Sequence, residues 1–393
     1  MGISTDQKKI NELLSRGVDE VIDKGDLLAK LQSGKELRVK LGIDPTSPNI
    51  HLGRAVPLLK LRDFQELGHK VVFIIGDFTG VIGDTSDKES ERPMLDDMTV
   101  EANAKDYITQ AGKILDVGKC EVHKNSEWLN ALTYKEVAKQ ADAFSVNNFI
   151  ARDNISGRLK AGKRVSLREV LYPLMQGYDS VQVKADVEVG GTDQRFNLLA
   201  GRELQKLYSG EPQNIVMNPL IEGLDGRKMS SSWGNTINLT DTARDMFGKI
   251  MSLKDDFITK YFMLVTRVPM DEIASYEKEL AGSINPKDIK VKLAKEIVKM
   301  YFSGKVADEE EEYFAKTFSE KKIPEDMPTV KPSDYDLLTV LIDAGFASSK
   351  GDAKRTIEQG GVKVNGEVVT DSNFTVPLGA TVQKGKIHFV RLV

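Results

Sequence analysis

The stretch PTSPNIHLGR, residues 45–54, decides the fold. It follows an apolar segment at residues 37–43 that is typical of a strand, and it runs into residues 55–67, whose apolar positions recur at helical spacing. Its last four residues, HLGR, therefore lie at a strand-to-helix turn. Because the first N–H groups of a helix lack intrahelical partners and the helix dipole is positive there, this turn predicts an anion site that fits a phosphate.

The segments on either side predict a layered α/β fold. Residues 39–43 are expected to be the first strand of a parallel sheet, and the helix that follows should end at Gly68. Residues 71–75 (VVFII) are continuously apolar and β-branched, which is typical of a strand buried on both faces. Residues 6–31 are expected to form one or two helices. Strand, helix and strand in this order indicate a doubly wound, Rossmann-like sheet.

Composition is that of a soluble globular chain. The 393 residues suffice for two or three domains, and 40% hydrophobic residues exclude the fibrous and disordered classes. The net charge of −4 gives no global attraction to nucleic acid, so RNA contact would need local basic patches. The single cysteine, Cys120, indicates a reducing compartment. Without a signal-peptide core or an apolar run of membrane-spanning length, we expect a cytoplasmic protein with no membrane contact.

A glycine-rich segment, GDFTGVIGD at residues 76–84, follows the second strand. We expect it to be a loop at the carboxyl edge of the sheet, where open α/β folds bind ligands. Its Asp77 fits a turn former and a ligand contact equally well. Asp84 is the stronger candidate for contact with a substrate ammonium group.

The segment YPLMQGYD, residues 172–179, places three polar side chains on one helical face. For this geometry Pro173 is expected in the first turn. A stripe of Tyr172, Gln176 and Asp179 would make a poor core face, so we interpret it as the wall of a pocket.

The next segment, ADVEVGGTDQ at residues 185–194, predicts a strand at 186–189 and a helix that begins near Thr192. The two glycines between them allow close approach of a ligand to the backbone. Asp193 could bond ribose hydroxyls and Gln194 a substrate carbonyl or amine. Capping of the helix by Thr192 or Asp193 fits equally well.

The segment LDGRKMSSSWGN, residues 224–235, is a polar loop with two adjacent cations and three hydroxyls. It predicts a mobile phosphate clamp. Taken alone, the same string fits a flexible linker or a phosphorylation site.

Together these motifs resemble a known family. HLGR is similar to the first signature of the class I aminoacyl-tRNA synthetases, His-apolar-Gly-His, and RKMSSS is similar to the second, Lys-Met-Ser-Lys-Ser. With YPLMQGYDS and VGGTDQRFN between them, they follow the order and approximate spacing of the tyrosyl-tRNA synthetases over residues 41–235. The chain departs from the pattern at Arg54 and Ser231. It also has Lys40 where some relatives have an aromatic partner for the phenol, which leaves the companion of Asp179 open.

The resemblance implies a domain order. It consists of a Rossmann-like parallel-sheet catalytic domain at residues 1–238, a helical anticodon-binding domain at 239–320, a linker at 321–334 and a small α+β RNA-binding domain at 335–393. The last resembles a module shared with a protein of the small ribosomal subunit.

The sequence supports the two C-terminal parts. Asn285-Pro286 is a clear helix start, Ser348 is expected to cap a later helix, and Asn365-Gly366 suits a type I′ hairpin turn. The outer face of the first helix is expected to carry Lys287, Lys290, Lys292, Lys295 and Lys299.

The implied activity is that of an ATP-dependent tyrosine–tRNA ligase. Tyrosine and ATP would give tyrosyl adenylate and pyrophosphate, and the tyrosine would then pass to the 3′ end of tRNA(Tyr). ATP would bring Mg²⁺ with it, without a dedicated protein metal site, and the family suggests a homodimer. The alternatives are a synthetase-derived RNA-binding or regulatory protein without aminoacylation, and a ligase for a related amino acid such as tryptophan.

The resemblance also implies roles for individual residues. The catalytic residues would be His51, Arg54, Lys228 and Arg227. The ATP-binding residues would be Asp44, Gly53, Gly191, Asp193, Ser230 and Ser231. The tyrosine-binding residues would be Asp84, Thr79, Tyr172, Gln176, Asp179 and Gln194. The tRNA-binding residues would be Arg158, Lys163, Arg164, Lys350, Lys354 and Arg355, although the basic run at residues 152–168 also fits a solvated face.

Overall fold

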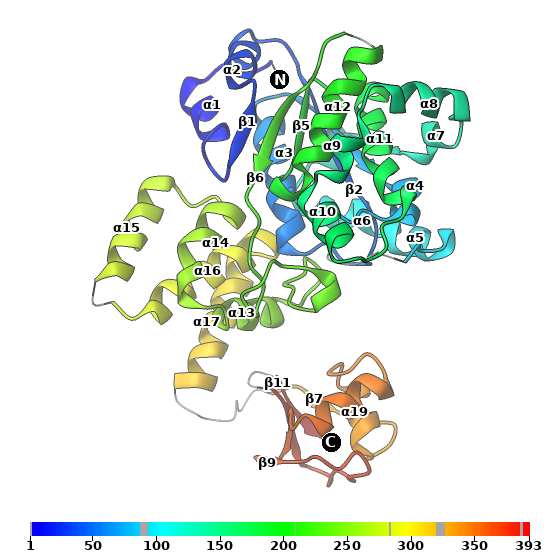
Figure 1. Ribbon diagram of the computed structural model, residues 1–393. Helices are drawn as coiled ribbons and strands as arrows, with labels where there is room; N and C mark the ends of the chain where they lie inside the picture. Colours follow the sequence, from blue (N-terminus) through cyan, green and yellow to red (C-terminus); the bar gives the residue numbers. More distant parts are fainter. Residues whose placement is uncertain (1, 87–92, 209, 283, 320–326, 386–387) are drawn as a thin grey trace. The chain divides into compact units, whose positions relative to one another are not determined.

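The computed structural model describes residues 2–86, 93–208, 210–282, 284–319, 327–385 and 388–393. The chain forms two units, each with its own internal contacts. The first consists of Met1–Asp241 and Ser252–Leu293, and the second of Thr242–Met251 and Ala294–Val393. Figure 1 shows a central sheet with surrounding helices in the first unit and a smaller sheet near the C-terminus in the second.

The central sheet has the strand order β1-β6-β5-β2-β3-β4. Neighbouring strands from β6 to β4 run parallel, as predicted, whereas β1 pairs antiparallel with β6 and makes the sheet mixed. Strand β1 also interrupts the segment predicted to be helical at 6–31. The bounds are β1 (Glu20–Ile22), β2 (Arg38–Ile43), β3 (Lys70–Ile75), β4 (Glu121–Lys124), β5 (Val187–Gly191) and β6 (Asn214–Asn218).

Strand β3 lies at the centre of the core. All five residues from Val71 to Ile75 are buried, and because successive side chains of a strand point to opposite faces, both faces are covered. Helix α3 (Leu52–Glu66) packs against β2, β3 and β5. His51 is its N-cap, and Gly68, with φ of 94°, follows its end. The predicted strand, helix and strand are thus confirmed, with the helix beginning three residues earlier than expected.

Two sequence expectations for the helices were wrong. Residues Asp77–Ile82 form the short helix α4 rather than a loop. Helix α11 (Leu167–Gln182) begins at a capping box of Ser166 and Glu169, so Pro173 lies well inside the helix and not in its first turn. The other helices of this region are α1 (Gln7–Leu13), α2 (Lys24–Gln32), α5 (Asp97–Ala104), α6 (Tyr107–Ala111), α7 (Ser126–Leu129), α8 (Tyr134–Asp142), α9 (Val146–Ile150), α10 (Asp153–Lys160) and α12 (Arg195–Tyr208).

Helices follow the central sheet. They are α13 (Ala243–Met251), α14 (Ile258–Val265), α15 (Met270–Ala281), α16 (Pro286–Tyr301) and α17 (Gly304–Ser319). Helix α16 begins at Pro286 as predicted, but the Lys290 side chain is buried and bonds the Leu253 carbonyl and Asp255, so it does not lie on the outer face. The two units divide the segment 239–320 between them, and a separate helical domain with those limits stays a prediction.

The C-terminal part contains a second sheet with the order β7-β11-β10-β8-β9. Asn365 and Gly366 both have positive φ (51° and 89°) between β8 and β9, as the predicted type I′ turn requires. The helix N-cap is Ser349, one residue after the predicted Ser348. The elements are β7 (Thr329–Val330), α18 (Leu337–Asp343), α19 (Lys350–Glu358), β8 (Val362–Val364), β9 (Glu367–Val368), β10 (Thr381–Lys384) and β11 (His388–Leu392).

The predicted linker at 321–334 is only partly visible. Its residues 321–326, including Pro324, lie outside the described residues, and β7 falls in the remainder. Within the described ranges, every helix falls short of the length and apolar character that crossing a bilayer would require.

Candidate active site

A cavity of about 250 Å³ opens at the carboxyl ends of β2, β3, β5 and β6. This is where a doubly wound sheet binds ligands, because the loops that leave neighbouring strands diverge there. The cavity is lined by nearly all the residues predicted to contact ATP or tyrosine. These are Asp44, His51, Gly53, Arg54, Thr79, Asp84, Tyr172, Gln176, Asp179, Gly191, Asp193, Gln194, Lys228, Ser230 and Ser231.

The start of helix α3 forms one wall. His51 is 6% exposed, and among the described residues its Nδ1 atom has no hydrogen-bond partner. Burial, reinforced by the positive charges of Arg54 and Lys228, lowers the pKa of His51 to about 3. His51 is therefore a neutral donor or acceptor here, and the positive charge at this wall comes from arginine and lysine.

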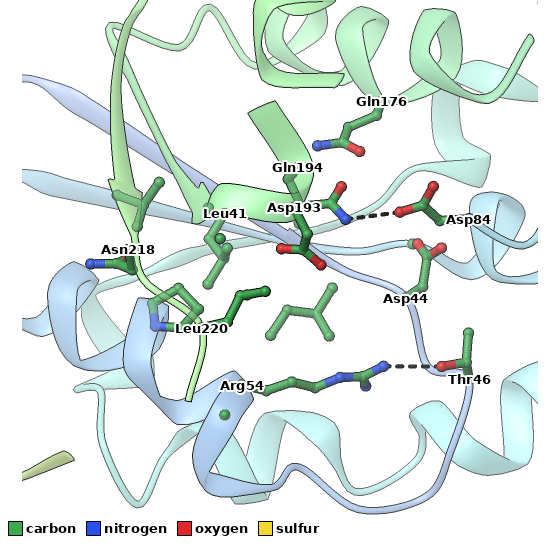
Figure 2. A pocket seen from close by; sticks show the side chains of 18 of the residues that line it. Leu41, Asp44, Thr46, Arg54, Asp84, Gln176, Asp193, Gln194, Asn218 and Leu220 are labelled. Carbon is green, nitrogen blue, oxygen red and sulfur yellow. Dashed lines mark hydrogen bonds between the residues drawn. The ribbon is translucent and has the colours of Figure 1, made fainter. Parts of the chain in front are cut away.

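Arg54 is held in place by two hydroxyls. Its Nη1 donates to Tyr107 Oη at 2.6 Å, and its Nη2 donates to Thr46 Oγ1 at 3.0 Å. Tyr107 is fully buried and donates in turn to the carbonyl of Ser47. Figure 2 shows the guanidinium reaching along the lower edge of the pocket towards Thr46. Neither Tyr107 nor Thr46 was predicted from the sequence as a partner of Arg54.

The segment around Lys228 meets the same wall. The sulfur of Met229 accepts a hydrogen bond from the Gly53 N–H at 3.3 Å, and the hydroxyls of Ser231 and Ser47 lie 3.0 Å apart. The Lys228 ammonium pairs with Asp193 at 2.7 Å. The two motifs, far apart in the sequence, thus contribute residues to the same cavity.

Arg227 does not share this location. Its guanidinium pairs with Asp225 and lies over the ring of Trp233, 4.5 Å from the centroid. It is largely exposed and does not line the cavity. The expectation that both cations of the pair face the nucleotide is therefore corrected for this structure, because the side chain of Arg227 turns back on its own loop.

Asp179, on α11, lines the same cavity and is buried. Its Oδ1 accepts from the Trp128 indole N–H at 2.8 Å, and its Oδ2 accepts from the Asn125 amide at 3.3 Å. Burial raises the pKa of Asp179 to about 7. Sequence reasoning missed both partners. The signal for Asn125 was its position directly after strand β4, at the same sheet edge as the other polar residues.

A chain of amides connects three predicted residues. Gln194 Nε2 donates to Asp84 Oδ2 at 2.8 Å, and the Nδ2 of Asn197 donates to the side-chain oxygens of Gln194 and Gln176 at 2.9 and 3.1 Å. Figure 2 shows Gln176, Gln194 and Asp84 together at the upper edge of the pocket. Burial raises the pKa of Asp84. Asn197, fully buried at the centre of this chain, was not predicted.

Asp44 joins the strand end of β2 to α11. It accepts from Tyr172 Oη at 2.8 Å and from Thr79 Oγ1 at 2.7 Å. Burial raises the pKa of Asp44 to about 6. Burial and the neighbouring carboxylates raise that of Tyr172 well above its usual value, so Tyr172 stays a protonated donor. Asp77, in contrast, bonds the backbone and hydroxyl of Ser126, which agrees with its structural alternative.

The residues predicted to bind tRNA divide into two groups. Arg158 is buried, with 3% exposure, and forms a bidentate ion pair with Glu169, so the prediction that it binds RNA is corrected. Its charge is already satisfied inside the protein. The remaining five side chains are exposed, and their role stays a prediction: Lys163, Arg164, Lys350, Lys354 and Arg355.

Comparison with known proteins identifies the family. The family model described as "tRNA synthetases class I (W and Y)" matches residues 32–319, and the model "S4 domain" matches residues 337–382. The tyrosine–tRNA ligase of Moorella thermoacetica is 47% identical over 390 residues, covering 97% of this chain and 94% of that protein. That of Thermotoga maritima is 45% identical over 386 residues, covering 97% and 96%.

Solved structures agree on the fold. A C-terminally truncated mitochondrial tyrosyl-tRNA synthetase from Aspergillus nidulans has a TM-score of 0.65 at 22% identity, covering 79% of this chain and 94% of that one. The tyrosyl-tRNA synthetase from Archaeoglobus fulgidus, solved with L-tyrosine, has a TM-score of 0.62 at 23% identity, covering 78% and 100%. The alternative of a protein without aminoacylation is not favoured. The chain belongs to the bacterial-type tyrosyl-tRNA synthetases of class I.

Proposed function

We propose that this cavity activates tyrosine with ATP through the residues that line it. The observation that carries the proposal is the arrangement of charge. Arg54 lies at the lower edge of the pocket and Asp84 at its upper edge (Figure 2), and Lys228 and the buried Asp179 line the same cavity. A zwitterionic amino acid with a ring hydroxyl and a triphosphate needs this separation of donors and acceptors.

We assign the tyrosine contacts by chemistry. Asp84, Gln176 and Tyr172 would receive the ammonium group, with Gln194 and Thr79 beside them. The carboxylate of Asp179 would accept the hydrogen bond from the phenolic hydroxyl. Because both oxygens of Asp179 are already oriented by Trp128 and Asn125, its geometry is fixed before tyrosine arrives.

We assign ATP to the side of the cavity that carries Arg54. Asp193 and Gly191 would contact the ribose, Asp44 and Gly53 would lie against the nucleotide, and the serine hydroxyls of the Lys228 loop would reach the phosphates. Lys228 would exchange its ion pair with Asp193 for the triphosphate. His51 would then lie beside the bound phosphates. Its Nδ1 atom is buried and has no hydrogen-bond partner among the described residues.

The first step needs no general base. The tyrosine carboxylate is already ionised and attacks the α-phosphorus; a new oxygen–phosphorus bond forms as the bond to pyrophosphate breaks. Alignment and stabilisation of the negative charge on the departing pyrophosphate therefore dominate the barrier. Arg54, Lys228 and the neutral ring of His51 would supply that stabilisation. In the second step the terminal ribose hydroxyl of tRNA attacks the tyrosyl carbonyl and releases AMP.

We propose that Mg²⁺ enters on the triphosphate. Among the described residues, no group of three or more His, Cys, Asp or Glu side chains is placed to hold a metal ion. When bound, the ion would neutralise phosphate charge.

We propose that the C-terminal module assists tRNA and not adenylate formation. A variant that ends at Ser319 should keep ATP–pyrophosphate exchange within about twofold, because the cavity belongs entirely to the first unit. Its rate of tRNA charging should fall about tenfold or more as basic contacts such as Lys354 are lost. Parallel exchange and charging assays test this, and an equal loss in both would contradict the assignment. Lys354→Glu in the full chain is the control for misfolding of the truncated one.

We propose a homodimer in the cytoplasm. Large apolar side chains are exposed on the consecutive helices α8 to α11, among them Tyr134 (96%), Val146 (70%) and Leu167 (71%), which is typical of a surface that a second copy covers. Val146→Asp should weaken association by about 2 kcal/mol or more. Sedimentation analysis should then show monomers at concentrations where the parent chain is dimeric. Leu207→Asp, on α12, is the matched control, and equal behaviour of both variants would contradict this interface.

A further inference from the structure

A buried ion pair lies beneath the amino-acid end of the cavity. Lys40 on β2 and Glu188 on β5 are 0% and 2% exposed, and their charged atoms lie 2.7 Å apart. The Lys40 ammonium also donates to Ser180 Oγ at 2.9 Å and to the Gln176 carbonyl at 3.1 Å. All three of its protons are thus used, and Lys40 has no exposed atom with which to touch a ligand.

Stability alone does not account for this pair. Removing two charges from water costs several kcal/mol per ion, and well-packed apolar residues of the same volume are often as stable or more so. The neighbouring β2 side chains Val39, Leu41 and Ile43 are apolar and buried. A lysine at the position between them therefore suggests a role other than packing.

The contacts of Lys40 lead to both ends of the amino-acid site. It donates to the backbone carbonyl of Gln176, whose side chain belongs to the network assigned to the ammonium group. Ser180, whose hydroxyl it holds, directly follows Asp179 on α11. The other side of the pair is closed by Glu188, which accepts from Ser180 Oγ at 3.0 Å and from the Gln213 amide.

We propose that Lys40, paired with Glu188, is a positioning residue for tyrosine selection: it fixes on strands β2 and β5 the part of helix α11 that carries Gln176 and Asp179, and its charge acts on the Asp179 carboxylate. This inference rests on the proposed function, in which Asp179 contacts the phenolic hydroxyl. Lys40 would act through Asp179 and not on the substrate.

The electrostatics of Asp179 support this role. Burial raises its pKa, the charge of Lys40 and the hydrogen bonds from Trp128 and Asn125 lower it, and the charge of Glu188 raises it again. The other ionisable groups that line the cavity near Asp179 are Tyr172 on α11, Asp44 after β2 and Asp84 after α4. His123 lies against the ring of Trp128, with centroids 5.7 Å apart.

Lys40 and Glu188 carry opposite charges, so replacing each should shift the pH dependence of kcat/KM in opposite directions. A purely structural role does not predict opposite shifts. In the parent enzyme kcat/KM for tyrosine should fall below about pH 7 as Asp179 takes up a proton. Lys40→Met should move this acid limb up by about one pH unit, and Glu188→Gln should move it down by a similar amount. One unit corresponds to about a tenfold loss of tyrosine kcat/KM on the acid side for Lys40→Met.

The experiment measures the pH dependence of tyrosine-dependent ATP–pyrophosphate exchange and, without chemistry, of tyrosine binding by equilibrium dialysis. Opposite shifts in Lys40→Met and Glu188→Gln, with the double variant near the parent, are the expected result. Shifts of the same sign, or no shift in either variant, would overturn the inference. If Lys40→Met does not fold, Glu188→Gln decides alone. An acid limb that moves to lower pH supports the proposal, and a limb that stays in place or moves to higher pH overturns it.

Asp179→Asn separates the two levels of the claim. It should remove the acid limb near pH 7, because no carboxylate is left at this position, whereas Asp44, with a pKa of about 6, and Asp84 still titrate. If the limb near pH 7 persists unchanged in Asp179→Asn, its titrating group lies elsewhere and the assignment of the phenol to Asp179 fails. If the limb disappears in Asp179→Asn but does not move in the charge variants, only the role of Lys40 fails.

Discussion

Replacing Lys228 with alanine should lower kcat for tyrosine-dependent ATP–pyrophosphate exchange by about 10²–10³-fold. Within the loop 224–235, Lys228 is the cation that lines the cavity, and it pairs there with Asp193. Loss of one preorganised group that meets developing charge raises the activation barrier by about 2–4 kcal/mol. The KM values for tyrosine should change much less, because tyrosine contacts a different part of the cavity.

The neighbouring arginine is the comparator for this variant. Arg227→Ala removes the same charge from the same loop, but its guanidinium is paired with Asp225 outside the cavity. We expect its loss of kcat to be at least about tenfold smaller than that of Lys228→Ala. His51→Ala should lower kcat as Lys228→Ala does, by removing a buried donor at the helix start. Exchange rates that survive intact in both His51→Ala and Lys228→Ala would contradict the assignment of this wall to the triphosphate.

Asp179→Asn should lower kcat/KM for tyrosine by about 10²-fold or more while leaving that for phenylalanine nearly unchanged. A hydrogen bond to a charged group contributes about 1.5–3 kcal/mol, and the amide that replaces it also loses its match to the Trp128 and Asn125 donors. Phenylalanine lacks the hydroxyl, so it loses no contact. The two amino acids are compared in the same exchange assay.

Asp84→Asn provides the matched control. Its carboxylate is assigned to the ammonium group, which tyrosine and phenylalanine share, so both substrates should lose kcat/KM by the same factor. A loss confined to tyrosine in Asp84→Asn, or an equal loss of both substrates in Asp179→Asn, would mean that the amino acid lies in the opposite direction in the cavity.

The parts of the fold that sequence predicted are those with strong local signals. Strand β3 was visible from five consecutive apolar residues, and the end of α3 from Gly68. Strand β1 was missed because three residues that include Glu20 have no strand pattern of their own, and only pairing with β6 makes them a strand. Helix α4 was missed because its glycine reads as a loop, whereas packing against α5 and α11 stabilises a helix there.

The site residues also divide into those with a local signal in the sequence and those without one. The residues at strand ends and at the start of α3 were predictable, because the sheet topology alone brings such positions to one edge. The supporting residues Trp128 and Tyr107 were not, since they come from segments with no motif and reach the site only through tertiary packing. Asn197 ends the motif VGGTDQRFN, but its bonds to Gln194 and Gln176 appear only in the structure. Arg158 was misread for a related reason. Its partner Glu169 lies eleven residues away, and a charge run does not reveal which member is buried.

The most direct test of tyrosine activation in this cavity is ATP–pyrophosphate exchange by the full chain with tyrosine, tryptophan and phenylalanine compared side by side. We expect rapid exchange with tyrosine and exchange lower by orders of magnitude with the other two, because only tyrosine satisfies the buried Asp179. Exchange that is fastest with tryptophan, or equal for tyrosine and phenylalanine, would contradict it.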